Sequence, residues 1–136
     1  GTHLEIVTPE GKTFSDQVDQ VVVPGSEGEL GVLSLHAPLV TALQPGELRY
    51  EKDKEWHILA VGSGLLEVTP DRVAVLSDLA VGEDDIDEGA VEEALAKAKE
   101  ALENPGDSTP EEVAAVQLAI QKSMAQLNVK RRRKRV

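Results

Sequence analysis

The residue types that could do chemistry are concentrated in one short segment, residues 25–31, which reads GSEGELG. Glycine recurs there at every third position, as in loops whose exposed backbone N–H groups wrap a phosphate. A phosphate loop needs positive potential nearby, and Glu27 and Glu29 supply the opposite sign. The glycines allow positive φ angles and a close approach by another surface. The segment therefore favours contact with a protein that offers basic or amide groups, and the alternative is a plain hairpin turn with solvated glutamates.

No arrangement of residues typical of catalysis is found elsewhere in the sequence. None of His3, His36 and His57 has a His or Glu at i+3 or i+4, and the chain has no cysteine. His57 is expected to be a half-exposed strand residue, whereas His36, close to a proline, is either a structural corner or a surface contact. The GSG segment at 62–64 opens no helix, so a bend or bulge in a sheet is favoured over an anion site. The sequence thus predicts no catalytic residue, no metal and no cofactor.

The charge of the chain is divided between an acidic body and a basic end. The formal net charge is −11, yet six of the 14 lysines and arginines lie in residues 130–135, which leaves residues 1–129 with 8 basic against 25 acidic side chains. The body is expected to repel nucleic acid and anionic membranes, whereas the end could bind either of them or an acidic protein surface. No apolar run approaches the roughly 20 residues of a membrane span, and no signal peptide is visible. The sequence therefore predicts no direct insertion into a bilayer.

The first half of the chain has the pattern of short strands. Hydrophobic residues make up 40% of the chain and aromatic residues only 2%, so the core must be built from Val, Leu, Ile and Ala. Short β-branched runs separated by turn residues indicate an all-β sandwich or barrel. No helical pattern lies between them, which argues against a parallel βαβ arrangement. The expected strands are residues 4–7, 18–23, 32–35, 39–43, 47–51, 55–61, 65–68 and 73–76.

After residue 82 the pattern becomes helical. Residues 85–103 are rich in Ala, Glu, Leu and Lys, which are strong helix formers. Asp84 and Asp85 are placed to cap the first turn and suit its positive dipole end. The NPGD sequence at 104–107 is expected to end this helix. Its expected apolar face consists of Val91, Leu95, Ala98 and Leu102.

A second helix is predicted from Thr109, because Pro110 suits the first helical position and Glu112 completes a capping box. Two helices joined by a short loop form an antiparallel hairpin. Alanines are frequent at its facing positions and bury little apolar area, so the hairpin is a candidate for a movable element; permanent docking is the alternative. The expected apolar face of the second helix consists of Val113, Val116, Ile120, Met124 and Leu127.

Several motifs follow one another along the chain. They read GSEGELGVL at 25–33, HAPL at 36–39, PGELR at 45–49, VGSGLLEV at 61–68 and AQLNV at 125–129. Together these motifs resemble the epsilon subunit family of F-type ATP synthases, and the resemblance covers essentially the whole chain. The order of a β part followed by a helical hairpin supports the resemblance independently.

The resemblance implies a ten-stranded flattened β-sandwich in residues 1–83 and an antiparallel helical hairpin in residues 84–136. It implies a non-catalytic place in the central rotor, between the gamma subunit and the ring of c subunits. That place is peripheral, in the F1 sector at the cytoplasmic face of a bacterial inner membrane. His36 and Thr41 would face gamma, and Glu29 is the best single candidate for contact with the c-ring. The residues implied for the c-ring contact are Ser26, Glu27, Gly28 and Glu29.

In several members of this family the hairpin is also an inhibitory switch, which extends along gamma into the alpha/beta hexamer and blocks ATP hydrolysis. Basic residues of the second helix then approach an acidic segment of the beta subunits. In this chain the basic end is expected to strengthen that contact, so deletion of residues 131–136 should relieve inhibition, particularly at low salt. The residues concerned are Lys130, Arg131, Arg132, Arg133, Lys134 and Arg135.

The resemblance departs from the family pattern at one motif. Some relatives bind ATP between the two helices with a motif of the form Ile/Leu-Asp-x-x-Arg-Ala. This chain keeps Ile86 and Asp87 but has Ala90 where the arginine would be. Because the cation that would face the phosphates is missing, weak or absent ATP binding is expected.

A rival hypothesis is a small acidic β-sandwich adaptor whose basic end binds nucleic acid. That end lacks the interleaved aromatic residues on which bases stack. The strongly anionic body also opposes such binding. A stoichiometric complex with a gamma subunit would separate the two hypotheses.

Overall fold

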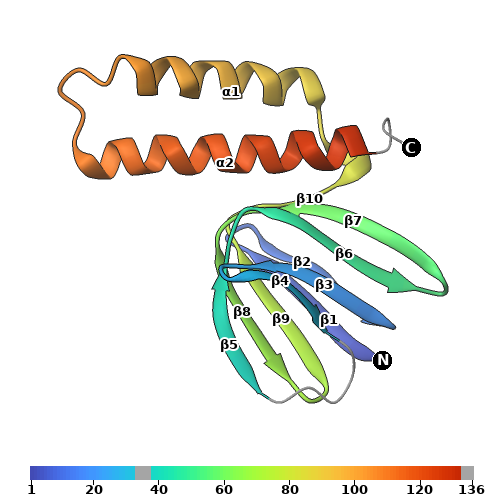
Figure 1. The fold of residues 1–136 in the computed structure, drawn as a ribbon. Coiled ribbons are helices and arrows are strands. Elements are labelled where there is room, and N and C mark those ends of the chain that lie inside the picture. Colours follow the sequence, from blue (N-terminus) through green and yellow to red (C-terminus); the bar gives the residue numbers. More distant parts are fainter. Residues whose placement is uncertain (33–37, 133–136) are drawn as a thin grey trace.

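The computed structural model describes residues 1–32 and 38–132, and it consists of a ten-stranded sheet followed by two helices (Figure 1). This order confirms the predicted β domain with a C-terminal helical hairpin. The strands are β1 (Thr2–Thr8), β2 (Gly11–Val18), β3 (Gln20–Gly25), β4 (Gly28–Val32), β5 (Leu39–Leu43), β6 (Gly46–Lys52), β7 (Glu55–Val61), β8 (Gly64–Thr69), β9 (Arg72–Ser77) and β10 (Ala80–Gly82). The helices are α1 (Glu88–Glu103) and α2 (Pro110–Arg132), preceded by a 3₁₀ turn at Glu83–Asp85.

The sheet is curled into two layers that face each other. Its strand order is β10-β7-β6-β3-β5-β8-β9-β1-β2, and β4 pairs only with β3. Neighbouring strands are antiparallel except β1 and β9, which are parallel. The two halves of the sheet are joined where Gly25 of β3 pairs with Leu43 of β5. The short length of this pairing allows the sheet to fold over at this point instead of remaining open.

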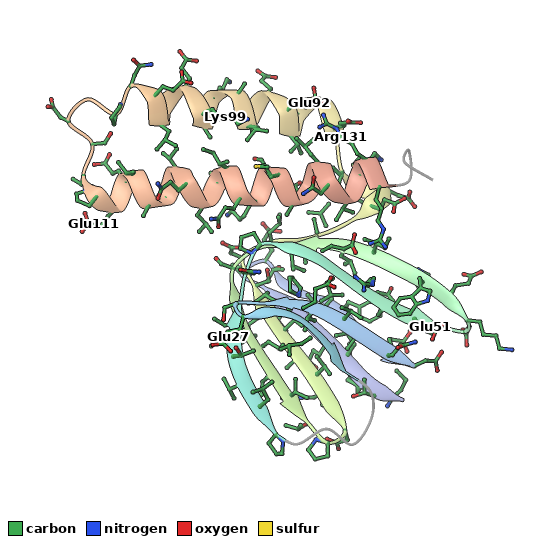
Figure 2. The ribbon with its side chains drawn as sticks, in the orientation of Figure 1. Glu27, Glu51, Glu92, Lys99, Glu111 and Arg131 are labelled. Atoms are coloured by element: carbon green, nitrogen blue, oxygen red, sulfur yellow. The ribbon has the colours of Figure 1, made fainter. Side chains whose placement is uncertain are left out.

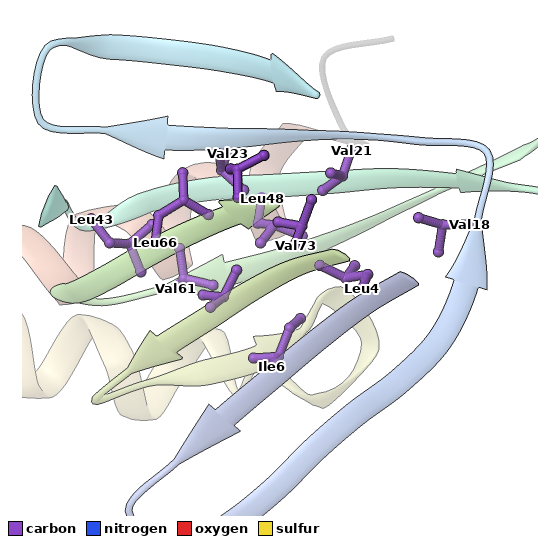
Figure 3. Packing of buried hydrophobic residues seen from close by; sticks show 12 residues of the cluster. Leu4, Ile6, Val18, Val21, Val23, Leu43, Leu48, Val61, Leu66 and Val73 are labelled. Carbon is purple, nitrogen blue, oxygen red and sulfur yellow. The ribbon is translucent and has the colours of Figure 1, made fainter. Parts of the chain in front are cut away.

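Aliphatic side chains fill the space between the two layers (Figure 3), as the composition predicts. Alternate residues of a strand point to opposite faces, so Leu4 and Ile6 of β1 are buried while Glu5 between them is not. Leu48 and Leu66, from opposite layers, are also completely buried. Burying a side chain of this size stabilises a fold by roughly 1.5–3 kcal/mol. The core thus needs no aromatic residue at its centre, and Phe14 and Tyr50 pack at its margin.

Two strands escape a pattern-based prediction, β2 and β10. The sequence of β2, GKTFSDQV, is largely polar because the strand forms the edge of the sheet and pairs only with β1. Asp16 of β2 forms an ion pair with Lys52 of β6, which ties this edge to the opposite layer. Strand β10 has only three residues, too few to show a period. Strands of this kind form because a neighbouring strand pairs with them, and their own sequence does not indicate a strand.

The predicted strand at 32–35 is displaced in the structure. The observed strand β4 begins four residues earlier, at Gly28, so the glycine-rich segment is itself part of a β-hairpin. Residues 33–35 lie outside the described part of the chain. Pairing of β4 with the strongly β-branched β3 overrides the low strand propensity of glycine.

The first helix starts later than its sequence predicts, and its cap is a different aspartate. Asp84 and Asp85 belong to the 3₁₀ turn, and the N-cap of α1 is Asp87, whose Oδ1 accepts a hydrogen bond of 3.1 Å from the backbone N–H of Ala90. Ile86 lies between the 3₁₀ turn and Asp87, has an extended backbone conformation and is only 4% exposed. The chain therefore places Ile86 in an apolar cluster before the helix can begin.

The second helix has the predicted capping box. The N–H of Glu112 donates to Oγ1 of Thr109 over 3.1 Å, and the N–H of Thr109 donates to the Glu112 carboxylate over 3.2 Å. The predicted apolar face is wrong at Met124, which is 47% exposed, while Ser123 and Ala125 are buried. The reason is that α2 contacts α1 as well as strands β6 and β7. A helix with two covered sides needs small residues that a single-face pattern does not anticipate.

The hairpin is docked against the sandwich through a second, small apolar cluster. Its buried members are Ala60 of β7, Ile86, Val91 of α1, and Leu127 and Val129 of α2. Ile58, Val81 and Leu95 are partly buried against it, and with five buried residues the cluster is smaller than the core of the sandwich. Among the described residues, no helix has the length and apolar character needed to cross a membrane.

Candidate functional site

The acidic segment forms the tip of the β3–β4 hairpin. Gly25 pairs with Gly28, which leaves Ser26 and Glu27 as a two-residue turn, and both side chains are exposed. The N–H of Ser26 donates to the carbonyl of Ala42 over 3.0 Å, which fixes the tip to β5. Figure 2 shows Glu27 at the margin of the sandwich. The tip is thus an exposed, acidic hairpin turn, as the alternative interpretation expected, and whether it contacts a partner stays a prediction.

The second glutamate of the segment has a partner inside the chain. Glu29 lies in β4 and accepts a 2.9 Å hydrogen bond from Nη1 of Arg49, which also bonds to Glu47 at 3.2 Å. Glu47 in turn forms an ion pair with Arg132 of α2. A row of alternating charges therefore runs from the acidic tip to the end of the second helix. Spacing along the sequence does not predict this network. Glu27 lies outside the network, at the apex of the turn.

The predicted gamma-facing residues lie on or near β5. His36 lies outside the described residues, and Thr41 is half-buried on the core side of its strand. The neighbours of Thr41, Val40 and Ala42, point to the outer face, and Val40 is 64% exposed. The predicted contact of Thr41 with gamma stays a prediction, and its neighbours Val40 and Ala42 are the residues of β5 that face outward.

An apolar stripe crosses the outer face of four strands. Register places Ala42 of β5 beside Leu65 of β8, Leu65 beside Leu76 of β9, and Leu76 beside Val7 of β1. Leu65 is 49% and Leu76 is 48% exposed. The stripe leads into an apolar hollow of about 340 Å³ between the β1–β2 turn and the start of β8. Large contiguous patches of exposed apolar surface are typical of sites that bind other proteins.

The described cations of the basic end bind oxygens of the chain itself, carboxylates for Arg131 and Arg132 and a backbone carbonyl for Lys130. Arg131 donates through Nε to Glu88 over 2.7 Å and also bonds to Glu92, so it clamps α2 to α1 (Figure 2). These hydrogen bonds raise the pKa of the Arg131 guanidinium above its ordinary value, first through Glu88 and then through Glu92. Nζ of Lys130 donates to the backbone carbonyl of Glu83 over 3.2 Å. Arg133, Lys134 and Arg135 lie outside the described residues.

A cavity of about 430 Å³ opens beside the end of α2. Tyr50, Trp56 and His57 form one wall, and the 3₁₀ turn and Arg132 form the other. Tyr50 stacks on His57 with ring centroids 4.9 Å apart. Within the described parts of the chain, no group of three or more His, Cys, Asp or Glu side chains could hold a metal ion.

Comparison with known protein families matches both parts of the chain. The beta-sandwich domain of the ATP synthase delta/epsilon chain matches residues 1–83, and the long alpha-helix domain of the same chain matches residues 84–131.

Similar full-length proteins and solved structures agree with these matches. An ATP synthase epsilon chain of Herpetosiphon aurantiacus is 39% identical over 131 residues, which cover 96% of this chain and 95% of the relative. An epsilon chain of Ruthia magnifica is 38% identical over 127 residues, 93% of this chain and 91% of the relative. In a mitochondrial ATP synthase of Euglena gracilis (OSCP/F1/c-ring), one chain superposes with a TM-score of 0.75 at 20% identity, covering 91% of this chain and 78% of that one. The last likeness concerns the fold alone.

Proposed function

This chain belongs to the ATP synthase delta/epsilon chain family, and from that membership we propose that it is a non-catalytic rotor subunit that couples the gamma subunit to the c-ring. The proposal is carried by the apolar stripe on the outer face of the sandwich, formed by Ala42, Leu65, Leu76 and Val7. The chain also matches both domains of the family. Gamma is the partner proposed for this stripe. The acidic tip around Glu27 is the proposed contact with the c-ring, on a separate projection. The complex would be peripheral, at the cytoplasmic face of a bacterial inner membrane.

Replacing Leu65 by aspartate is expected to weaken the complex with gamma by tenfold or more, because a charge would replace a side chain at the centre of an apolar interface. The folded structure should survive, since Leu65 is 49% exposed. Titration of labelled gamma subunit measures the loss. Trp56→Asp is the matched control, because Trp56 is 45% exposed on β7, away from the stripe, and should leave the affinity unchanged.

Equal binding by the Leu65→Asp variant and the unaltered chain would contradict the proposed gamma surface. A salt-sensitive shift of DNA without any gamma complex would favour the nucleic-acid adaptor instead.

We further propose that the hairpin inhibits ATP hydrolysis when it leaves the sandwich and reaches the alpha/beta hexamer. Support comes from the small area of its docking cluster and from the cations at the end of α2. In the docked arrangement Arg131 and Arg132 are bound to Glu88, Glu92 and Glu47. Release of the hairpin from the sandwich would free Arg132 for an acidic surface of the beta subunits, and separation of α1 from α2 would free Arg131 as well.

ATP is expected to bind this chain weakly or not at all. Ala90, at the position of the motif arginine, has no cation to offer a phosphate, and Asp87 is already used as the cap of α1. Titration calorimetry of the isolated chain with ATP should therefore give no saturation in the low micromolar range. A dissociation constant of a few micromolar would contradict this expectation.

A further inference from the structure

One polar contact joins α2 to the sandwich at the point where the helix leaves it. Nζ of Lys122 lies 3.3 Å from Oδ2 of Asp78, in the connection between β9 and β10. The other docking contacts described above lie further along α2, from Leu127 to Arg132. Towards its N-terminus, α2 projects past the sandwich (Figure 1). A separation of the hairpin that starts from this free part must first break the contact of Lys122.

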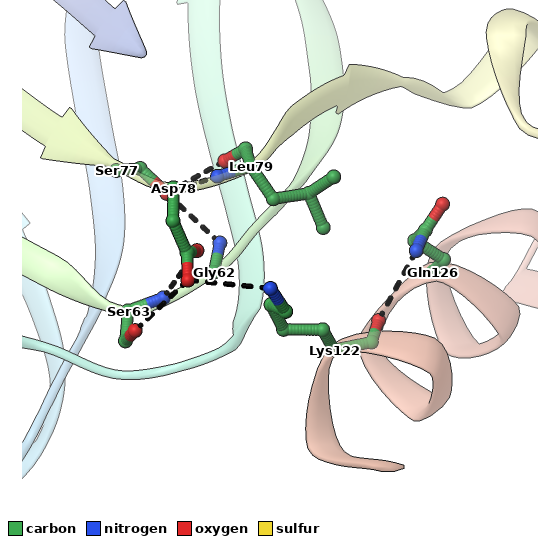
Figure 4. Close-up of polar contacts among 7 residues, drawn as sticks. All are labelled: Gly62, Ser63, Ser77, Asp78, Leu79, Lys122 and Gln126. Carbon is green, nitrogen blue, oxygen red and sulfur yellow. Dashed lines mark hydrogen bonds and ion pairs between the residues drawn. The ribbon is translucent and has the colours of Figure 1, made fainter. Parts of the chain in front are cut away.

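The carboxylate of Asp78 is held in place by the sandwich itself (Figure 4). Its Oδ1 accepts a hydrogen bond of 3.0 Å from the N–H of Ser63, and its Oδ2 accepts one of 3.2 Å from the Ser63 hydroxyl. The N–H of Asp78 donates back to the carbonyl of Ser63 over 3.1 Å. The negative charge is therefore oriented before the lysine arrives, so little side-chain freedom is lost at the acidic partner when the pair forms.

The residue beside Ser63 must be glycine for this contact to exist. A Cβ on Gly62 would lie 1.9 Å from Oδ1 of Asp78 and 3.1 Å from Cδ of Lys122. The N–H of Gly62 donates to the Ser77 hydroxyl over 2.9 Å, which fixes the backbone at this place. The Asp78 carboxylate and the aliphatic part of Lys122 thus both pack against Gly62, where any side chain would collide with them. The side chains of Lys122 and Asp78 are 30% and 34% exposed, so water screens the pair only partly.

We propose that the Asp78–Lys122 ion pair is a latch that sets the balance between the docked and the released hairpin. The apolar docking cluster is small, so one oriented and partly shielded ion pair is a considerable share of what holds the helices. The latch lies apart from the acidic residues that bind Arg131 and Arg132. Its consequence for ATP hydrolysis rests on the proposed function, whereas its effect on docking does not.

The experiment uses the absence of cysteine from the chain. Cysteines introduced at the exposed positions Glu10 and Glu103 carry spin labels. Pulsed electron paramagnetic resonance measures the distribution of distances between the two labels in the isolated full chain. That distribution gives the populations of docked and released hairpin. Asp78→Asn keeps an oxygen for the Ser63 N–H but removes the charge, and it should raise the released-to-docked ratio about twofold to fivefold. Lys122→Met keeps the stem over Gly62 and should raise the ratio equally.

Three further variants make the test specific. The double variant of Asp78→Asn and Lys122→Met should show no more release than either single one, because the two residues act as a pair. Lys122→Arg should restore docking. Lys97→Met removes a hairpin cation that is paired only with Glu93 of its own helix at 3.5 Å, and it should leave the ratio unchanged.

Release no greater in the Asp78 and Lys122 variants than in Lys97→Met, or fully additive effects in the double variant, would overturn the latch. In the assembled synthase, Asp78→Asn should lower the rate of ATP hydrolysis. A shifted distance distribution with an unchanged rate would support the latch and reject the inhibitory function.

Discussion

Replacing Gly64 by alanine is expected to lower the free energy of unfolding of this chain by about 3 kcal/mol, the upper end of the usual cost of overpacking. A Cβ at this position would lie 1.8 Å from the carbonyl oxygen of Leu76 and 3.2 Å from Cα of Ser77. Both obstacles are backbone atoms of the neighbouring strand, so no change of rotamer relieves the clash. Gly64 pairs with Ser77 in the β8–β9 ladder and with Leu43 of β5, so the displacement would spread to three strands.

Chemical denaturation followed by circular dichroism measures this loss. Gly89→Ala is the matched control, because its Cβ would meet nothing closer than 3.7 Å, at Oδ1 of Asp87. Alanine has a higher helix propensity than glycine, and position 89 lies in the first turn of α1. The control should therefore stabilise the chain by a few tenths to about 1 kcal/mol. A loss below about 1 kcal/mol at Gly64 would mean that the β8–β9 ladder adapts to the added methyl group.

The sequence predicts the elements that have a strong period of their own and fails at those that depend on neighbours. The β-branched runs of β3, β7 and β9 and the capping box of α2 are recognisable because each carries its signal locally. The polar strand β2 is stable only because β1 lies beside it and Lys52 faces its Asp16. The start of α1 depends on the burial of Ile86, which is a tertiary requirement.

The candidate sites show the same division between local and distant information. The exposed tip with Glu27 follows from glycine spacing and charge within a few residues. The partners of the charged groups do not, because Arg49 lies 20 residues from Glu29, Lys122 lies 44 from Asp78, and Arg132 lies 85 from Glu47. The resemblance implies one role for the basic end, which is contact with the beta subunits. The structure adds a second role for two of these cations, because Arg131 joins α2 to α1 and Arg132 joins α2 to the sandwich.

These two roles predict opposite effects for two kinds of variant in the assembled synthase. Changing Glu47, Glu88 and Glu92 together to glutamine removes the docked partners of Arg131 and Arg132 and leaves the basic end intact. Glu88 and Glu92 join Arg131 to α1 inside the hairpin, whereas Glu47 joins Arg132 to the sandwich, so the released-to-docked ratio should rise about twofold to fivefold. If the released hairpin inhibits, ATP hydrolysis should slow by a similar factor wherever the docked form predominates.

Deletion of residues 131–136 removes the docked contacts and the cations that would bind the beta subunits at the same time. Because the docked arrangement keeps its apolar cluster and the Lys122 contact, the loss of attraction to the hexamer should dominate, and hydrolysis should rise severalfold. The rise should shrink between low and physiological salt, since screening already weakens the attraction that the deletion removes.

Glu111→Gln is the matched control for the triple variant, because Glu111 is exposed in the first turn of α2. A change of hydrolysis in the same direction for the triple variant and the deletion would contradict the division of these cations between docking and inhibition.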